Sequence, residues 1–530
     1  MHGSIIDAKI LSHRDAHIQR YAVTAQQMGD IEARVFAAGM PVAALMEKVA
    51  GRITQRITHL YPDPSTPMGI LVGPGHNGGD ALVVARELHL QGYPVRIFRP
   101  FERLKELTAA HAQYAASLGI PASDRPEIVA DCEVLIDGLF GFGLTRPLEG
   151  AIAQSIAEIN AWQKPVLSID LPSGIHTDTG AALGTPLRAH HTFCLGLWKR
   201  AFLQDQALPF VGTTELIDFG LPLADIEAVL GRAMLDEPEL QRITPTVALC
   251  QLPLPRSPIT QKYQEGHALL ICGSRQYTGA ALLAGLSARA SGVGMLTIAV
   301  PEAMRSLVVA QIPDALVVGC EETSEGAIAC LPAAVDLSRF QAIGCGPGLT
   351  PSAIDVVKQA LAAPVPLVLD ADGLNILASL DAVAMLRQRH APTVLTPHPG
   401  EFRRLFPSLA EVMGDRLRVT QQAAQASGAI VLLKGARVAI ASPQGKIWAN
   451  PESTPALARG GSGDVLTGLI TGLLAQNSLR ARPPEQSVQT ATWWHAHAGR
   501  WAAHKRTEIG VDASTLLQTL IPSLQDFHFT

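Results

Sequence analysis

The sequence predicts an α/β protein of two domains. Short apolar segments of strand length alternate with longer amphipathic ones, and this alternation occurs twice along the chain. A glycine-rich loop that ends in an aspartate opens a helix in each half, at residues 73–80 and 460–464. The 530 residues also exceed what one hydrophobic core normally serves. We therefore expect a parallel three-layer sandwich over residues 1–228 and a second α/β domain over residues 229–530.

The first half begins with two helical segments, at 24–37 and 41–57, before the alternation starts. Right-handed crossovers between parallel strands place helices on both faces of a sheet, with ligand loops at the carboxyl ends of the strands. The motif loops follow the apolar segments and are therefore expected at that edge. The expected strands are 69–72, 95–99, 134–136 and 166–169, and the expected helices are 79–91, 102–118 and 150–162.

The second half repeats the pattern after a weaker stretch. Between about residues 221 and 258 the alternation gives way to acidic helical turns and the proline-rich segment 252–258, which is typical of a connector. We place the domain boundary near residue 229. The expected strands beyond it are 268–271, 296–300, 367–369, 394–396 and 430–433, followed by a hairpin of 437–441 and 446–449 around a Ser-Pro-Gln-Gly turn.

Composition excludes several classes of function. The chain is 47% hydrophobic and 17% charged with a net charge of −5, so it offers no basic field for nucleic acid. Residues 1–7 carry charge where a signal peptide needs an apolar run, and no later run reaches membrane-spanning length. The seven cysteines never show CxxC spacing, which argues against a disulfide framework or a zinc site. We expect a cytoplasmic protein with buried free thiols.

The first glycine loop has the features of an anion site. Glycines allow backbone amides to approach a ligand, and the helix that follows presents its positive end to the same place. The loop lacks the dinucleotide fingerprint GxGxxG. Asp80 would oppose a bound anion, so its presence suggests proton transfer or cation binding. The alternative is a tight turn in which Asp80 only complements the helix dipole.

Two further strand ends converge on this loop. Asp137 ends one expected strand and is followed by a glycine-rich segment with Arg146, a cation suited to phosphate. Asp170 and Ser173 follow the next strand. Oxygen-bearing side chains at Asn77, Asp137 and Ser173 would suit a hard cation. A local hydrogen-bond network among them remains equally open from the spacing.

These stretches, with residues 39–41 and 45–51, resemble the NAD(P)H-hydrate epimerase family over most of residues 20–228. The resemblance implies a Rossmann-like fold, Asp170 as a substrate-binding acid or base, and K⁺ held by Asn77, Asp137 and Ser173. The family's loop usually begins with two asparagines, whereas this loop begins with His76 and has Ala81 where glycine is common. The implied substrate-binding residues are His76, Asn77, Gly78, Gly79, Asp80, Gly141, Phe142, Gly143, Leu144, Thr145, Arg146, Pro147 and Asp170.

The second glycine loop precedes an apolar helix, and its geometry suits a phosphate at amide donors. Asp464 would then be placed to take the proton from a hydroxyl that attacks phosphorus. Lys434 and Arg437 follow another apolar strand and supply two cations for phosphates. The chain has no Walker A sequence, so any phosphate chemistry must use another fold. A helix cap by Ser462 is the alternative.

The late GxGD helix start resembles the ribokinase-like superfamily. Within it, five segments across residues 262–528 are similar to NAD(P)H-hydrate dehydratase: 277–281, 344–348, 370–375, 396–401 and 460–464. The resemblance implies that the hydrated nicotinamide nucleotide contacts Ala280, Gly348, His398 and Asp464. It implies that the adenine nucleotide is held by Lys434, Gly435, Ala436, Arg437, Val438 and Gly463. Without the resemblance, His398 would be interpreted as a histidine that caps the next helix.

Together the resemblances imply a bifunctional isomerase and lyase. It would interconvert the R and S hydrates of NADH and NADPH, then phosphorylate the C6 hydroxyl of the S form with ADP, assisted by Mg²⁺, and eliminate phosphate. Small-molecule partners and a homo-oligomer are expected, without nucleic acid or membrane. A different class of function also stays open, in which a ribokinase-like small-molecule kinase is fused to a nucleotide-sensing module without catalysis.

Overall fold

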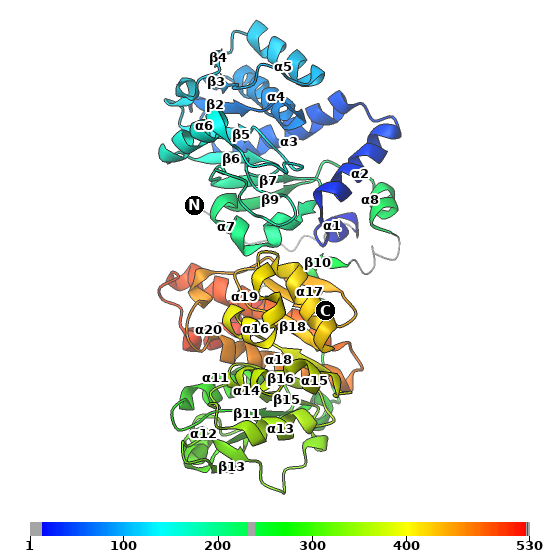
Figure 1. The fold of residues 1–530 in the computed structure, drawn as a ribbon, viewed down its shortest axis with the longest axis vertical. Helices are drawn as coiled ribbons and strands as arrows, with labels where there is room; N and C mark the ends of the chain where they lie inside the picture. Colours follow the sequence, from blue (N-terminus) through cyan, green and yellow to red (C-terminus); the bar gives the residue numbers. More distant parts are fainter. Residues whose placement is uncertain (1–12, 232–238, 526, 528–530) are drawn as a thin grey trace. The chain divides into compact units, whose positions relative to one another are not determined.

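The computed structural model describes residues 13–231, 239–525 and 527, which form two compact units with 239 as the first described residue of the second (Figure 1). Residues 1–7, on which the signal-peptide prediction rests, lie outside the described residues. Across the described ranges, no helix is both long enough and apolar enough to cross a bilayer. That the protein is a cytoplasmic homo-oligomer that binds no nucleic acid stays a prediction.

The first unit is built on a parallel sheet with the order β4-β3-β2-β5-β6-β7-β9. Side chains of β2 alternate between the two faces, with Ile70 and Val72 in one core cluster and Leu71 in the other. Strands covered on both faces have continuous apolar runs, which is why the sequence predicted four of them. The strands are β2 (Met68–Val72), β3 (Val95–Phe98), β4 (Ala122–Ser123), β5 (Val134–Gly138), β6 (Val166–Ile169), β7 (His191–Leu195) and β9 (Thr213–Ile217).

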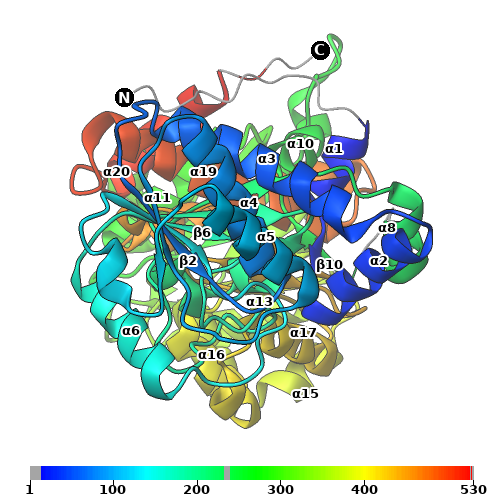
Figure 2. The ribbon, with the colours of Figure 1, turned by 90° about the horizontal axis from the view of Figure 1, so that it is seen from above.

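Helices cover both faces of this sheet, as expected. The lead-in helix α2 (Ala25–Ala37) begins with a capping box, in which the Thr24 hydroxyl accepts from the Gln27 amide at 3.1 Å and the Gln27 side chain accepts from the Thr24 amide at 2.9 Å. Figures 1 and 2 show α6 on the side of the sheet opposite α3, α4 and α5. The other helices are α3 (Val42–Leu60), α4 (His76–Leu90), α5 (Glu106–Ser117) and α6 (Gly150–Ala161).

The second unit contains an eleven-stranded sheet with the order β10-β20-β19-β18-β17-β16-β15-β11-β12-β13-β14. Pairing is parallel from β18 through β13, and the predicted hairpin of β19 and β20 is antiparallel. The strands are β10 (Leu240–Arg242), β11 (His267–Ile271), β12 (Met295–Pro301), β13 (Leu316–Glu322), β14 (Ile328–Cys330), β15 (Ala342–Cys345), β16 (Leu367–Leu369), β17 (Thr393–Leu395), β18 (Ile430–Leu433), β19 (Val438–Ala441) and β20 (Ile447–Asn450).

Two helical layers enclose this sheet. One core cluster contains apolar residues of α11 (Thr278–Ala290), α18 (Ser462–Leu479), α19 (Pro484–Arg506) and α20 (Ala513–Leu520). The opposite cluster contains those of α13 (Ile354–Ala362), α14 (Asp372–Ser379), α16 (Pro399–Leu405) and α17 (Arg416–Ser427). Helix α11 follows β11, and α18 follows β20, which runs in the same direction as β18. Both helices therefore begin at the edge of the sheet where the parallel strands end.

The expected connector is only partly correct. Helix α8 (Leu223–Leu230) packs Ile226 into the core of the first unit. Strand β10 pairs with β20 in the second sheet, so the proline-rich segment 252–258 lies inside the second unit. Both ends of the expected connector thus belong to the compact units.

The cysteines are all free, as predicted, and five of the seven are buried. Cys250, the last residue of α10 (Pro245–Cys250), is exposed, and Cys330 is partly exposed. The expectation of buried thiols was wrong for these two because each ends a short surface element.

Candidate active sites

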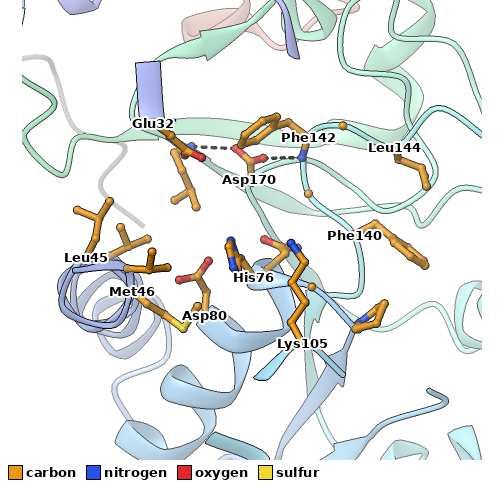
Figure 3. Close-up of a pocket in the computed structure, with 18 of the residues that line it drawn as sticks. Glu32, Leu45, Met46, His76, Asp80, Lys105, Phe140, Phe142, Leu144 and Asp170 are labelled. Atoms are coloured by element: carbon orange, nitrogen blue, oxygen red, sulfur yellow. Dashed lines mark hydrogen bonds between the residues drawn. The ribbon is translucent and has the colours of Figure 1, made fainter. Parts of the chain in front are cut away.

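A cavity of about 400 Å³ lies at the carboxyl edge of the first sheet (Figure 3). Its polar side chains come from α2, the start of α4 after β2 and the end of β6, with Lys105 ahead of α5, and the loop after β5 also lines it. Its apolar walls come largely from α2 and α3. The sequence-predicted residues that line it are His76, Asn77, Asp80, Gly141, Phe142, Gly143, Leu144 and Asp170.

The remaining predicted residues surround this cavity without lining it. A Cβ atom on Gly78 would lie 2.0 Å from the Gly73 carbonyl oxygen, and one on Gly79 would lie 2.6 Å from the Met46 methyl carbon. These glycines therefore serve the tight turn and close packing of α3 on α4. Thr145, Arg146 and Pro147 are exposed.

Asp170 is held by several donors at the end of β6. Its carboxylate accepts from the Phe142 amide at 2.8 Å and lies 2.5 Å from Lys199 Nζ. Its backbone φ of 70° is in the left-handed region, a conformation that is costly outside glycine and is concentrated at functional sites. Lys199 is fully buried; burial alone would lower its pKa, but the charges of Asp170, Cys194 and Glu32 and the Asp170 hydrogen bond together outweigh it and the pKa is raised. The Lys199 ammonium is therefore charged.

Sequence reasoning missed Lys199. It follows the apolar segment that ends at Trp198, and a lone lysine in a stretch that is otherwise buried was the available signal. A buried lysine needs a buried anion, and the end of β6 supplies it.

Two other carboxyl groups enter the cavity without a partner. Glu32, from α2, and Asp80, from α4, both line it, and within the described residues neither side chain forms a hydrogen bond or ion pair. Burial raises the pKa of Glu32 to about 7, with Lys199 opposing and Asp170 adding to the shift. Burial, then the charges of Glu32 and Asp170, raises the pKa of Asp80 well above its usual range. Glu32 belongs to no motif, so the sequence gave no sign of it.

Two of the three expected cation ligands, Asp137 and Ser173, contact each other. The Asp137 carboxylate accepts from the Ser173 hydroxyl at 2.6 Å, the Ser168 hydroxyl at 2.9 Å and the Leu139 amide at 3.1 Å. The hydrogen-bond network that the spacing left open is therefore present for Asp137 and Ser173, whereas Asn77 lines the cavity. Asn77 Nδ2 is buried without a partner in the structure described. Because amide nitrogen and oxygen are hard to distinguish, this orphan atom also fits a side chain that presents oxygen to a cation.

The second site lies where β15 to β18 end. Lys434 follows β18 and places its Nζ 2.5 Å from the carboxylate of Asp370, which follows β16. Asp370 also accepts from the Thr467 hydroxyl at 2.6 Å. Its side chain is almost wholly buried. The sequence placed Asp370 in a motif but assigned it no role.

The glycine loop meets this ion pair at the start of α18. A Cβ atom on Gly463 would lie 3.1 Å from Lys434 Nζ, so the predicted nucleotide-binding residues Lys434 and Gly463 are brought together. Ser462 does not cap the helix, which corrects that alternative, because its hydroxyl and carbonyl contact His495 Nε2 at 3.2 and 3.0 Å. Burial lowers the pKa of His495 to about 4, so the ring is neutral and anchors the loop.

Asp464 is the carboxyl group of this loop. Burial raises its pKa to about 7, and the charge of Asp370 adds to the shift while Lys434 opposes it. A group with this pKa exchanges protons readily near neutral pH.

The other predicted residues of the second site lie at neighbouring strand and helix ends. A Cβ atom on Gly348 would lie 2.9 Å from the Ala280 methyl carbon, so these two positions are adjacent. His398 caps α16, since its Nδ1 accepts from the Gly400 amide at 2.9 Å, and about half of its side chain is exposed. The capping interpretation is thus confirmed, and it leaves the ring edge accessible. Gly435, Ala436 and Arg437 lie in the turn from β18 into β19, and Val438 is the first residue of β19.

Among the described residues, no group of three or more His, Cys, Asp or Glu side chains could hold a metal ion. Mg²⁺ commonly binds through one or two carboxylates together with substrate phosphates. Asp464 and the loop amides fit that mode of binding.

Comparison with known proteins agrees with both motif sets. The family model described as YjeF-related protein N-terminus matches residues 42–201, and the model described as NAD(P)H-hydrate dehydratase matches residues 268–522. The bifunctional NAD(P)H-hydrate repair enzyme of Thermosynechococcus vestitus is 53% identical over 95% of this chain and 97% of its own length. The chain belongs to the family of bifunctional NAD(P)H-hydrate repair enzymes.

Two further proteins are also similar. The protein of Gloeobacter violaceus is 48% identical over 95% of this chain and 97% of its own length. The crystal structure of the ADP/ATP-dependent NAD(P)H-hydrate dehydratase of Bacillus subtilis covers 53% of this chain and 96% of its own at 32% identity, with a TM-score of 0.46. The resemblance predicted from the motifs is confirmed for both halves.

The buried Lys199–Asp170 pair makes a prediction about stability. Lys199→Met removes one partner and leaves a buried carboxylate, which should destabilise the first domain by about 3–5 kcal/mol. Lys199→Met with Asp170→Asn should recover most of that loss, because no charge is then left alone. Denaturant unfolding measures both. Arg96→Met, which breaks an exposed pair with Asp131, is the matched control and should cost about 1 kcal/mol or less. Equal losses in the single and double variants would contradict the assignment.

Proposed function

We propose that the first domain interconverts the R and S hydrates of NADH and NADPH, and that the second domain dehydrates the S hydrate with ADP as phosphoryl donor. The observation that carries the proposal is the meeting of Lys434, Gly463 and Asp464 at the carboxyl edge of the second sheet. This arrangement brings together the Lys434 cation, the amides at the start of α18 and the Asp464 carboxyl group, whose pKa is near neutral. Phosphoryl transfer to a hydroxyl needs these three elements.

In the first domain, the cavity suits a nucleotide whose ring and phosphates differ in polarity. Phe36, Leu45, Met46 and Phe219 supply apolar surface for the uncharged hydrated ring. The start of α4 has no side-chain cap, so its amides and nearby Lys105 suit the phosphates.

His76 replaces the family's usual asparagine at the start of α4. Burial, with the charge of Lys105, lowers the pKa of its imidazole, so the ring is neutral at pH 7. A neutral imidazole can donate and accept hydrogen bonds as an amide does, which supports retention of substrate binding.

We place K⁺ at Asn77, Asp137 and Ser173. When bound, the ion would supply a fixed positive charge near the anionic part of the substrate. The Ser173 hydroxyl lies 3.2 Å from the Phe140 carbonyl oxygen, so it has a second acceptor and can free an Asp137 oxygen for the ion.

In the second domain, Asp464 takes the proton of the C6 hydroxyl as that oxygen attacks the terminal phosphorus of ADP, and the bond between that phosphorus and the bridging oxygen breaks so that AMP leaves. Lys434 and the loop amides stabilise the charge that develops on the transferred group, and Mg²⁺ held by the phosphates would neutralise more of it. Hydroxide leaves poorly, whereas phosphate leaves with its electron pair when C5 loses a proton. The double bond of the reduced ring is then restored.

Separated R and S hydrates test the proposal directly. With ADP and Mg²⁺, the protein should restore the absorbance of the reduced ring from both epimers. Asp464→Asn should lower dehydration by about 10² to 10⁴ fold while epimerisation continues. Asp355→Asn, an exposed carboxylate of the same domain, is the matched control. Near-normal dehydration by Asp464→Asn would refute the assigned base, and a stable phosphorylated product would favour the kinase alternative.

The pH dependence of dehydration should report the same residue. The base must be ionised, and the pKa of Asp464 is raised to about 7, so kcat/KM should fall about tenfold per pH unit below that value and level off above it. Rate profiles measured on the S hydrate with saturating ADP test this. The Asp464→Asn variant should not show this fall of kcat/KM at low pH. A profile that is flat from pH 5 to 8 would show that another group takes the proton.

A further inference from the structure

Epimerisation places a demand on the cavity that one carboxylate does not meet. In the R and S hydrates the C6 hydroxyl projects from opposite faces of the ring. If the apolar walls hold the ring in one pose, the hydroxyl leaves on one face and water returns on the other. Each face then needs its own group to handle a proton.

Two carboxyl groups stand on different sides of the cavity. Asp80 projects from α4 beside Met46 and His76, whereas Asp170 ends β6 beside Glu32 and Phe142 (Figure 3). The side chains of Asp80 and Asp170 therefore approach a ligand from two directions.

The environments of the two groups differ in a way that suits opposite roles. Asp170 lies 2.5 Å from Lys199 Nζ and accepts a hydrogen bond from the Phe142 amide. Asp80 forms no hydrogen bond or ion pair within the described residues, and burial beside the charges of Glu32 and Asp170 raises its pKa. A carboxyl group paired with a cation beside one without a partner suits a base beside an acid.

We propose that Asp80 is a second catalytic residue of epimerisation and serves the ring face opposite the one that Asp170 serves. The inference rests on the proposed function of the first domain and deepens it. It gives Asp80 a role in proton transfer in place of the substrate-binding role that the motif implied.

In one direction, Asp80 gives its proton to the C6 hydroxyl. The C6–O bond then breaks with its electron pair on oxygen, and the N1 lone pair forms a double bond to C6. Water leaves, and another water adds to C6 on the far face while the N1–C6 double bond returns its pair to nitrogen. The added water loses its proton to Asp170. Proton exchange with solvent resets both carboxyl groups, and the reverse direction begins from protonated Asp170.

Oxygen exchange separates the two faces. In ¹⁸O water without ADP, wild type should interconvert the epimers and label both. Asp80→Asn and Asp170→Asn should each lose interconversion by about 10² fold or more with little change in KM, above the rate without enzyme. Each variant should still label one epimer, and the labelled epimer should differ between them. Glu47→Gln is the matched control, because Glu47 lies on α3 next to Met46 but pairs with Arg86.

Three results would overturn the inference. Retained interconversion in Asp80→Asn would show that Asp80 is not needed for either face. A raised KM with unchanged kcat, or the same epimer labelled in both variants, would assign Asp80 to binding. Failure of the proposed function is distinguishable, since wild type itself would then leave separated epimers unchanged.

Discussion

Each domain pairs a buried aspartate at the end of a parallel strand with a lysine. Lys199 and Lys434 each place Nζ 2.5 Å from a carboxylate, that of Asp170 in the first domain and that of Asp370 in the second. A buried carboxylate without such a partner would take up a proton, because removing its charge from water costs several kcal/mol. The two ion pairs therefore fix the positions of charges in both sites, and these charges affect the pKa values of the other carboxyl groups nearby.

This effect on the pKa is seen in the carboxyl groups that form no ion pair with a lysine. Burial, and then the charges of the neighbouring carboxylates, raises the pKa values of Asp80, Glu32 and Asp464. Burial and like charge thus create groups that exchange protons near neutral pH, next to loops whose amides suit phosphates. The two domains form this arrangement on different sheets. In both, the site lies at the carboxyl edge of a parallel sheet, where several strand ends meet.

The sequence predicted the parts of the molecule whose signal is local. Buried strands such as β6 and β16 are mainly apolar runs, and their predicted bounds agree with the structure. Strand β9 was missed because Thr213, Thr214 and Glu215 are polar and only partly buried at the edge of the sheet. The glycine loops were predicted because their amides and turns impose a pattern on neighbouring residues.

Residues whose role depends on distant parts of the chain could not be predicted in this way. Glu32 enters the first cavity from α2, and Lys199 reaches Asp170 from beyond β7; neither has a motif around it. The position of His495 beneath Ser462 likewise depends on the packing of α19 against α18. For such residues, only the fold shows which charges meet.

The charge pattern of the second site matters only if the C6 oxygen attacks phosphorus. The most direct measurement follows that oxygen. S hydrate labelled with ¹⁸O at C6 is incubated with ADP, Mg²⁺ and the Asp80→Asn/Asp170→Asn double variant, which lacks both groups proposed to exchange the label. The phosphate released is then examined by ³¹P NMR. The account predicts ¹⁸O in inorganic phosphate, and label found only in water would contradict it.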